Sequence, residues 1–298
     1  MRKGLIGLAL AAGAAAGLAF AALSPHAPPA LPPAELAARL AEPLPPPAGP
    51  MRVFHLGHSL VGREMPAMLA AMRPGHVSHS QLGWGASLAQ HWTGKVPGFA
   101  AENAHPDFRP AGAALASGDY DAVILTEMVE LRDAIRWHDS ADHLARWSER
   151  ARQGRPDVRL YLYETWHRRD DPAGWAARIA TDRPALWEAA LLAPAMARPA
   201  TGKIHVIPAG QVLAAAAAAI DAGRVPGMSA GDALFSDDIH LSAAGLWLVA
   251  LTHHAVLYHR LPDPGGLPLP PGAETALRGI VWQTVLADPA TGIPETAR

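Results

Sequence analysis

One serine, one aspartate and one histidine in this chain have the types and spacing needed for nucleophilic catalysis. Ser59 lies in the tetrapeptide Gly-His-Ser-Leu at residues 57–60, and Asp237 precedes His240 by three residues far downstream. A serine hydroxyl is a poor nucleophile until a neighbouring imidazole accepts its proton and a carboxylate holds that imidazole in the correct tautomer. The three-residue spacing lets the carboxylate of Asp237 reach Nδ1 of His240, which leaves Nε2 free to face Ser59.

The same residues also have structural interpretations. Serine and aspartate are preferred helix N-caps, because their side-chain oxygens accept hydrogen bonds from free backbone N–H groups. Ser59 could therefore cap a helix after the first strand, and Asp237 or Asp238 could cap a helix beginning near Leu241. The combination favours catalysis over capping, since the serine follows a predicted strand and the Asp-x-x-His pair directly precedes the last helix of the sheet domain.

The elements that must position these residues alternate along the chain. Short apolar segments, most of them rich in Val, Ile, Leu or Tyr, predict strands at 51–56, 76–82, 121–126, 158–164 and 203–208. Helices are expected at 65–72, 138–153, 173–190, 211–222, 241–259 and 273–286. Alternating strands and helices imply a mostly parallel sheet covered on both faces, which gives a three-layer α/β/α domain. Ligands of such sheets bind beyond the carboxyl ends of the strands, where Ser59 is expected.

Composition excludes several classes of function. Half of the residues are apolar and the formal net charge is −2, which supports a large buried core and argues against a nucleic-acid partner. The chain has no cysteine, so disulfides, iron–sulfur clusters and thiol nucleophiles are excluded. Fifteen histidines raise the question of a metal, but no His-Glu-x-x-His motif occurs. Neither a metal nor another cofactor is expected.

The first fifty residues predict export. Arg2 and Lys3 precede an uncharged apolar run at 4–23, which is typical of a secretory signal peptide or of an uncleaved signal anchor. The protein is therefore expected in the periplasm or cell envelope, with membrane contact only through this segment. Residues 24–50 hold ten prolines, which predicts an extended linker in which 34–40 could form a brief helix. The main folded domain is expected at 51–262, followed by a C-terminal extension at 263–298 with one helix packed on the domain.

The first and last of these motifs resemble those of the SGNH/GDSL hydrolase family. That family begins with Gly-Asp-Ser-Leu or a near variant and ends with Asp-x-x-His, as at Asp237–His240 here. The likeness covers about residues 51–259 in architecture, but only the two end blocks match sharply. It implies a flavodoxin-like parallel sheet of about five strands, a serine nucleophile, and ester hydrolysis or acyl transfer. His58 stands where the family has Asp or Asn, and we interpret it as a structural residue.

The resemblance also implies an oxyanion hole. The backbone N–H groups of Ser59 and of Gly85 would contribute to it, with Gly83 as the alternative glycine. The family's third block supplies an asparagine, but here the third strand ends in Thr126 and Glu127. Thr126 could donate a weaker hydrogen bond, whereas an ionised Glu127 can only accept. The expected hole is therefore Ser59, Gly85 and Thr126, one strong donor short of the family pattern.

Four further residues near strand ends are candidates for substrate contact: Trp84, Glu127, Trp166 and His167. The two tryptophans could stack on sugar rings or fill space in the core. Position alone suggests that His167 pairs with Glu164 or Glu127. The function expected from these residues is that of an exported serine esterase acting on an O-acyl group, most plausibly acetyl on a carbohydrate. The alternative is a non-catalytic, carbohydrate-binding or structural envelope protein on the same scaffold.

Overall fold

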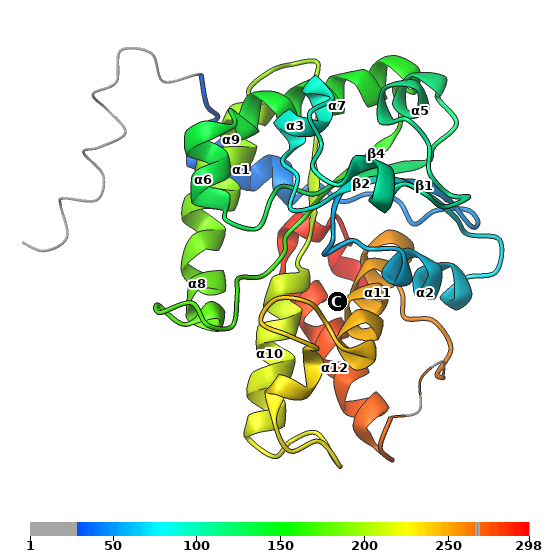
Figure 1. Cartoon of the computed structure of the whole chain (residues 1–298), viewed down its shortest axis with the longest axis vertical. Coiled ribbons are helices and arrows are strands. Elements are labelled where there is room, and N and C mark those ends of the chain that lie inside the picture. The colour runs from blue at the N-terminus through cyan, green and yellow to red at the C-terminus, as the bar shows by residue number, and fades with distance from the viewer. Residues whose placement is uncertain (1–28, 266, 268, 298) are drawn as a thin grey trace, which may run out of the picture.

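The protein is built on a five-stranded parallel sheet with the strand order β2-β1-β3-β4-β5. A computed structural model describes residues 29–265, 267 and 269–297. The strands are β1 (Arg52–His58), β2 (Val77–Gly83), β3 (Ala122–Leu125), β4 (Arg159–Tyr163) and β5 (His205–Ile207). Helices cover both faces of the sheet (Figure 1), so the prediction of a three-layer, flavodoxin-like α/β fold is confirmed.

The apolar runs form strands that are buried on both faces. Along β1, Val53 faces one hydrophobic core and Phe54 faces the other, because successive side chains of a strand point to opposite sides. In β3 the four residues Ala-Val-Ile-Leu are all buried, and they divide between the two cores in the same way. Burial on both sides explains why these strands read as continuous apolar segments instead of alternating ones.

The helices form two groups on opposite sides of the sheet (Figure 1). One group packs on the core that contains Val53: α2 (Glu64–Met72), α8 (Trp175–Asp182), α10 (Ala209–Asp221), α11 (Ala243–Tyr258) and α12 (Ala273–Ala287). The other group packs on the core that contains Phe54: α1 (Pro33–Leu40), α3 (Leu88–Thr93), α5 (Ala111–Ser117), α6 (Leu131–Trp137), α7 (Ser140–Gly154) and α9 (Ala193–Met196). α12 is the helix expected in the C-terminal extension, and Leu277, Val281 and Val285 bury its inner face.

Several short elements depart from the sequence expectation. α3, α4 (Phe99–Glu102), α5 and α6 have four to seven residues each, too few to show a helical period in the sequence. The helix expected at 173–190 is α8 followed by a ten-residue π-helix, Arg183–Leu192, which continues into α9. Short 3₁₀ turns complete the described chain at Gly231–Leu234, Pro289–Thr291 and Glu295–Ala297.

The proline-rich stretch is packed on the domain, which corrects the expectation of a free linker for residues 29–50. Leu36 and Leu40 of α1 are buried in the same core as Phe54. Backbone hydrogen bonds fix both sides of this helix, from Leu31 N to Ala193 O (3.1 Å) and from Leu44 N to Gly292 O (2.7 Å). Proline restricts the backbone of this stretch, but the leucines of α1 still pack against the apolar core of the domain.

The predicted signal segment at 1–23 and the start of the linker at 24–28 lie outside the described residues. In the part of the chain that the structure describes, no helix has the length and apolar character needed to cross a membrane.

Candidate active site

Ser59 lies where the strand order of the sheet reverses. It directly follows β1, and β1 pairs with β2 on one side and with β3 on the other. After β1 the chain forms β2 on one side of it, and then β3, β4 and β5 follow in order on the other side. Such a reversal opens a crevice at the carboxyl ends of the strands, and ligands of open parallel sheets bind there.

Ser59, His240 and Asp237 form a continuous chain of hydrogen bonds. His240 Nε2 lies 3.1 Å from Ser59 Oγ, and His240 Nδ1 lies 2.8 Å from Asp237 Oδ2. A carboxylate can only accept, so Nδ1 carries the proton of the neutral imidazole and Nε2 accepts from the Ser59 hydroxyl. The structure thus brings together the three residues whose spacing suggested catalysis, hydrogen-bonded in the order serine, histidine and aspartate.

The loop backbone keeps Asp237 ionised. Its Oδ1 accepts hydrogen bonds from the N–H groups of Ile239 (2.8 Å) and His240 (2.6 Å). The N–H of His240, followed by that of Ile239 and by the His240 imidazole, holds the pKa of the Asp237 carboxyl well below its usual range. Asp237 therefore remains a charged acceptor for the imidazole at every pH at which the fold is expected to operate.

The structure does not support the capping interpretations. The N-cap of α11 is Ser242, whose Oγ accepts from Gly245 N (3.3 Å), and Asp237 and Asp238 precede it by several residues. α2 begins at Glu64, five residues beyond Ser59. The side chains of Ser59 and Asp237 are thus not used at either helix end.

Contacts from the loop after β4 hold the Asp237–His240 loop in place. The indole N–H of Trp166 donates to Ile239 O (2.7 Å), and Arg169 N donates to Asp238 O (2.8 Å). The Arg168 guanidinium pairs with the Asp238 carboxylate (3.2 Å). Trp166 is buried in the core, which agrees with the space-filling interpretation and contradicts stacking on a sugar.

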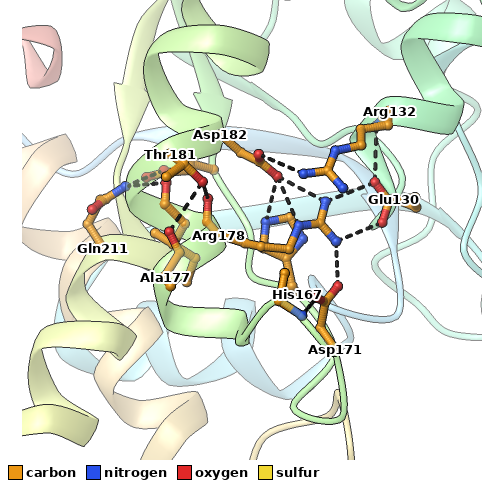
Figure 2. A network of polar contacts seen from close by, with 12 residues as sticks. Glu130, Arg132, His167, Asp171, Ala177, Arg178, Thr181, Asp182 and Gln211 are labelled. Carbon is orange, nitrogen blue, oxygen red and sulfur yellow. Dashed lines mark hydrogen bonds and ion pairs between the residues drawn. The ribbon is translucent and has the colours of Figure 1, made fainter. Parts of the chain in front are cut away.

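His167 belongs to a buried ion cluster that Figure 2 shows. Its Nε2 lies 3.2 Å from Asp182 Oδ2, and the Arg178 guanidinium at the centre pairs with Asp182, Asp171 and Glu130. Burial, followed by the charge of Arg178, lowers the pKa of His167. The expected pairing of His167 with Glu164 or Glu127 is therefore wrong, and so is its expected contact with substrate.

Glu164 and Glu127 are occupied elsewhere. Glu164 is buried and pairs with Arg183 (3.2 Å). Glu127 is also buried, and its Oε1 accepts from Met128 N (2.8 Å) and Leu88 N (3.2 Å) at the start of α3. Burial raises the pKa of Glu127 to about 7. A fully buried carboxyl is not available to a substrate, so the structure contradicts the expected role of Glu127 in substrate binding.

His58 links the loops that follow β1 and β3. Its Nε2 donates to Glu127 O (2.9 Å), and its Nδ1 accepts from Leu60 N (3.3 Å). Burial lowers the pKa of His58 to about 4, so the ring is neutral and uses one nitrogen as donor and the other as acceptor. This side chain fixes the backbone on both sides of Ser59. It carries out the structural role expected of it, through a partner that the sequence did not indicate.

Two backbone groups near Ser59 are free to bind an oxyanion. Within the described residues, the N–H groups of Ser59 and Gly85 take part in no hydrogen bond. Gly85 is exposed with φ +55°, and a Cβ on it would meet no described atom within 4 Å. Gly83 is the last residue of β2, and a Cβ there would lie 2.3 Å from Val96. Gly85 is therefore the better candidate of the two glycines.

Thr126 does not present its hydroxyl at the surface. The residue is fully buried, and its Oγ1 has no hydrogen-bond partner among the described residues. Its side chain packs against Gly57, where an added Cβ would come within 2.8 Å of Thr126 Cβ. The third-block position thus offers no exposed side-chain donor in this structure.

No arrangement of three or more His, Asp or Glu side chains suited to a metal ion occurs in the described part of the chain. At the carboxyl edge, the hydrogen-bonded groups that could take part in a reaction are Ser59, His240 and Asp237.

Comparisons with known proteins relate this chain to others by fold. No family model matches the sequence, and no curated protein matches it. A solved DUF4886 family protein from Bacteroides uniformis shares the fold, with a TM-score of 0.57 and 16% identity over 79% of this chain and 95% of that one. A protein from Parabacteroides merdae, described as a candidate GDSL-like lipase, has a TM-score of 0.42 and 11% identity over 68% of this chain and 94% of that one.

Proposed function

We propose that this protein is a serine esterase that cleaves an O-acyl ester, with acetyl on a carbohydrate as the substrate class. The hydrogen-bonded chain Ser59–His240–Asp237 at the carboxyl edge of the sheet carries this proposal. The likeness of the first and last motifs to those of SGNH/GDSL hydrolases supports it. In this order the histidine can accept the serine proton while the carboxylate holds the imidazole in the required tautomer.

The reaction follows from the geometry. As Ser59 Oγ bonds to the acyl carbon, its proton passes to His240 Nε2 and the carbonyl electron pair moves onto oxygen. Collapse of this intermediate breaks the bond to the alcohol, which leaves with the proton from His240. Water then repeats the sequence on the acyl-serine, releasing a carboxylic acid and free Ser59. Asp237 stabilises the imidazolium that forms in each half of the reaction.

The negative oxygen of the intermediate is bound by the N–H groups of Ser59 and Gly85. Backbone donors suit this role because they are fixed before the reaction begins. Each lost oxyanion donor costs roughly 10²–10³ in rate, so a hole with two donors predicts a slower enzyme than one with three.

The openness of the triad supports a large alcohol component. The side chains of His240 and Asp237 are 45% and 55% exposed, so the reacting edge faces solvent and is not enclosed in an apolar cavity. An open edge admits an ester on a polymer, whereas a long acyl chain needs a concave apolar pocket. The same residues would also serve acyl transfer, in which a sugar hydroxyl replaces water.

We also propose that the protein acts outside the cytoplasm. The basic start and apolar run of residues 1–23 support export, either as a cleaved signal peptide or as an anchor. Export would place the enzyme with the glycans of the cell envelope.

A fluorophosphonate probe tests the catalytic assignment directly. The full chain is incubated with the probe and its intact mass is recorded for the parent, for Ser59→Ala and for Ser117→Ala, a serine on the opposite side of the sheet domain from His240. We expect one adduct on the parent and on Ser117→Ala, and none on Ser59→Ala. Labelling of folded Ser59→Ala to the same extent as the parent would overturn the assignment of the nucleophile.

The buried Thr126 hydroxyl favours one alternative, a carbohydrate-binding envelope protein that has lost catalysis. This alternative predicts glycan binding by the parent, by Ser59→Ala and by His240→Ala alike, together with no turnover of any acetyl ester. Ester hydrolysis that depends on Ser59 would exclude it.

A further inference from the structure

An exposed tryptophan stands beside the proposed nucleophile. Trp84 is 58% exposed, which is unusual for a side chain that gains so much from burial. His58 and Gly83 are the last paired residues of β1 and β2, so Ser59 and Trp84 are the next residues along two neighbouring strands. Gly85, the candidate oxyanion donor, follows Trp84 directly. The backbone of Trp84 is therefore adjacent to that of Ser59 at the carboxyl edge of the sheet.

The indole is held in one orientation. Its N–H donates to Glu102 Oε1 (2.6 Å), and the backbone N–H of Trp84 donates to Pro97 O (2.8 Å). The backbone of Gly98 lies against the ring, since a Cβ on Gly98 would come within 2.3 Å of Trp84 Cδ2. Gly98 has φ +66°, and a residue without a side chain is required at this close approach. The backbone of Gly98 thus covers one side of the ring, and the rest of the indole is exposed to solvent.

The segment that supports the indole is tied to the loop that carries Ser59. Arg63, four residues after Ser59, donates from Nη2 to Ala101 O (2.6 Å) and Glu102 O (3.0 Å). These bonds connect the segment 97–102 to the β1–α2 loop. A ligand that rests on the indole is consequently held at a fixed place relative to the Ser59 hydroxyl, as pre-organised binding requires.

The chemistry of this surface selects a sugar over an acyl chain. The face of an indole is electron-rich and attracts the C–H groups of a pyranose ring, and its own N–H is already satisfied by Glu102. The flanking side chains of Arg63 and Glu102 are polar groups that can bond hydroxyls at the edge of such a ring. An acyl chain would instead need an apolar concavity, with no charged groups at its border.

We propose that Trp84 is a platform for the sugar ring that bears, or adjoins, the ester cleaved at Ser59. This inference rests on the proposed esterase function and names the substrate class of the same site. A second exposed tryptophan offers a matched control. Trp137, at the end of α6, is 66% exposed, and the Arg136 guanidinium lies 4.5 Å from its ring centre.

The test compares two esters in the full chain, with 4-nitrophenyl acetate as a probe without a sugar and O-acetylated xylooligosaccharide as a glycan. For Trp84→Ala we expect kcat/KM on the glycan ester to fall, mostly through KM, at least about tenfold further than kcat/KM on 4-nitrophenyl acetate. Trp84→Phe should retain part of the glycan activity, and Trp137→Ala should change neither. Equal losses on both esters, or no loss on the glycan, would overturn the platform.

A binding measurement separates failure of this inference from failure of the proposed function. Calorimetry with Ser59→Ala and O-acetylated oligosaccharides of xylose, glucose and mannose needs no turnover. Binding that is lost in Ser59→Ala/Trp84→Ala supports the platform even if the parent hydrolyses neither ester. Absence of binding to every one of these oligosaccharides by Ser59→Ala refutes it, whatever the esterase assay gives.

Discussion

The triad and the cluster around Arg178 use the same kinds of side chain in opposite surroundings. In the triad, the side chains of His240 and Asp237 are about half exposed. Ser59 bonds to His240, and His240 bonds to Asp237, so the contacts form a single line. In the cluster, Arg178 and Asp182 have exposed fractions of 5% and 6%, and the guanidinium contacts three carboxylates (Figure 2). The triad is a linear chain of hydrogen bonds that is open to solvent, whereas the cluster is a set of ion pairs gathered around one buried guanidinium.

The difference separates groups that exchange protons from groups that hold the chain together. A general base must take up and release a proton within each turnover, so it needs access to a ligand. A buried guanidinium among several carboxylates cannot change its charge without leaving them uncompensated. The cluster joins the loop after β3, the loop after β4 and α8, and the second of these loops holds Ile239 and Asp238 through Trp166 and Arg169. The rigid region thereby supports the reactive one.

The largest effect is expected on activity when the orienting carboxylate is neutralised. Asp237→Asn keeps an oxygen for the N–H groups of Ile239 and His240 but favours the wrong imidazole tautomer, so kcat should fall by about 10⁴. Thermal unfolding should stay close to that of the parent. Asp238→Asn is the control, since that carboxylate pairs with Arg168 instead, and it should keep its activity. Similar kinetics for the two variants would remove Asp237 from the triad.

The next effect is expected on stability when the cluster loses its cation. Arg178→Met leaves the buried Asp182 carboxylate without this guanidinium, which should lower the free energy of unfolding by about 3–5 kcal/mol. Arg168→Met removes exposed ion pairs with Asp170 and Asp238 and should change the unfolding midpoint far less than Arg178→Met does. Urea denaturation of the three proteins measures both changes. Equal midpoints for Arg178→Met and the parent would show that the cluster does not stabilise the fold.

Glu127 is a third case, a buried carboxyl that accepts from backbone N–H groups, and it predicts a pH effect. Its pKa is about 7 in the folded protein against a usual 4.5, so the folded state binds more protons between these values. Its contribution to stability is therefore present below about pH 4.5 and is lost as the pH rises through 7. Relative to the parent, Glu127→Gln should gain about 2–3 kcal/mol between pH 5 and pH 8. Denaturation at the two pH values measures this gain, and the pH dependence of all other groups cancels in the difference. A constant difference would contradict the raised pKa.

The smallest effect is expected from the indole that links the two regions. Trp166→Phe removes the donor to Ile239 O, which should lower kcat about three- to tenfold with little change in KM, because His240 is positioned less accurately. Trp147→Phe is the control, since its buried indole also donates to a backbone carbonyl, that of Leu88 (3.0 Å). Both variants should lose about 1 kcal/mol of stability. A loss of kcat that is equal in the two would assign Trp166 to general stability only.

The sheet and the contact between Asp237 and His240 can be predicted from the sequence because their signals are local. Strands buried on both faces appear as apolar runs, and three residues of spacing suffice to join Asp237 to His240. Side-chain direction was not predictable, and for this reason Trp166 and His167 were placed at the site although both point into the protein. The Arg178 cluster joins Glu130 to a residue 48 positions away, a distance over which residue spacing carries no information. The packing of residues 29–50 also depends on a distant apolar surface, which composition does not reveal.

The packed stretch at 29–50 also decides how the domain would respond to a pull on its N-terminal end. Tension applied ahead of residue 29 would act first on the hydrogen bond from Leu31 to Ala193 and on the packing of α1 against the core. It would reach β1 only after these contacts had broken. Such a contact can peel open one turn at a time while the strand that ends at Ser59 carries no load. If the protein were held to a surface by its N-terminal segment, a pull would therefore detach α1 before it disturbed the strand that ends at Ser59.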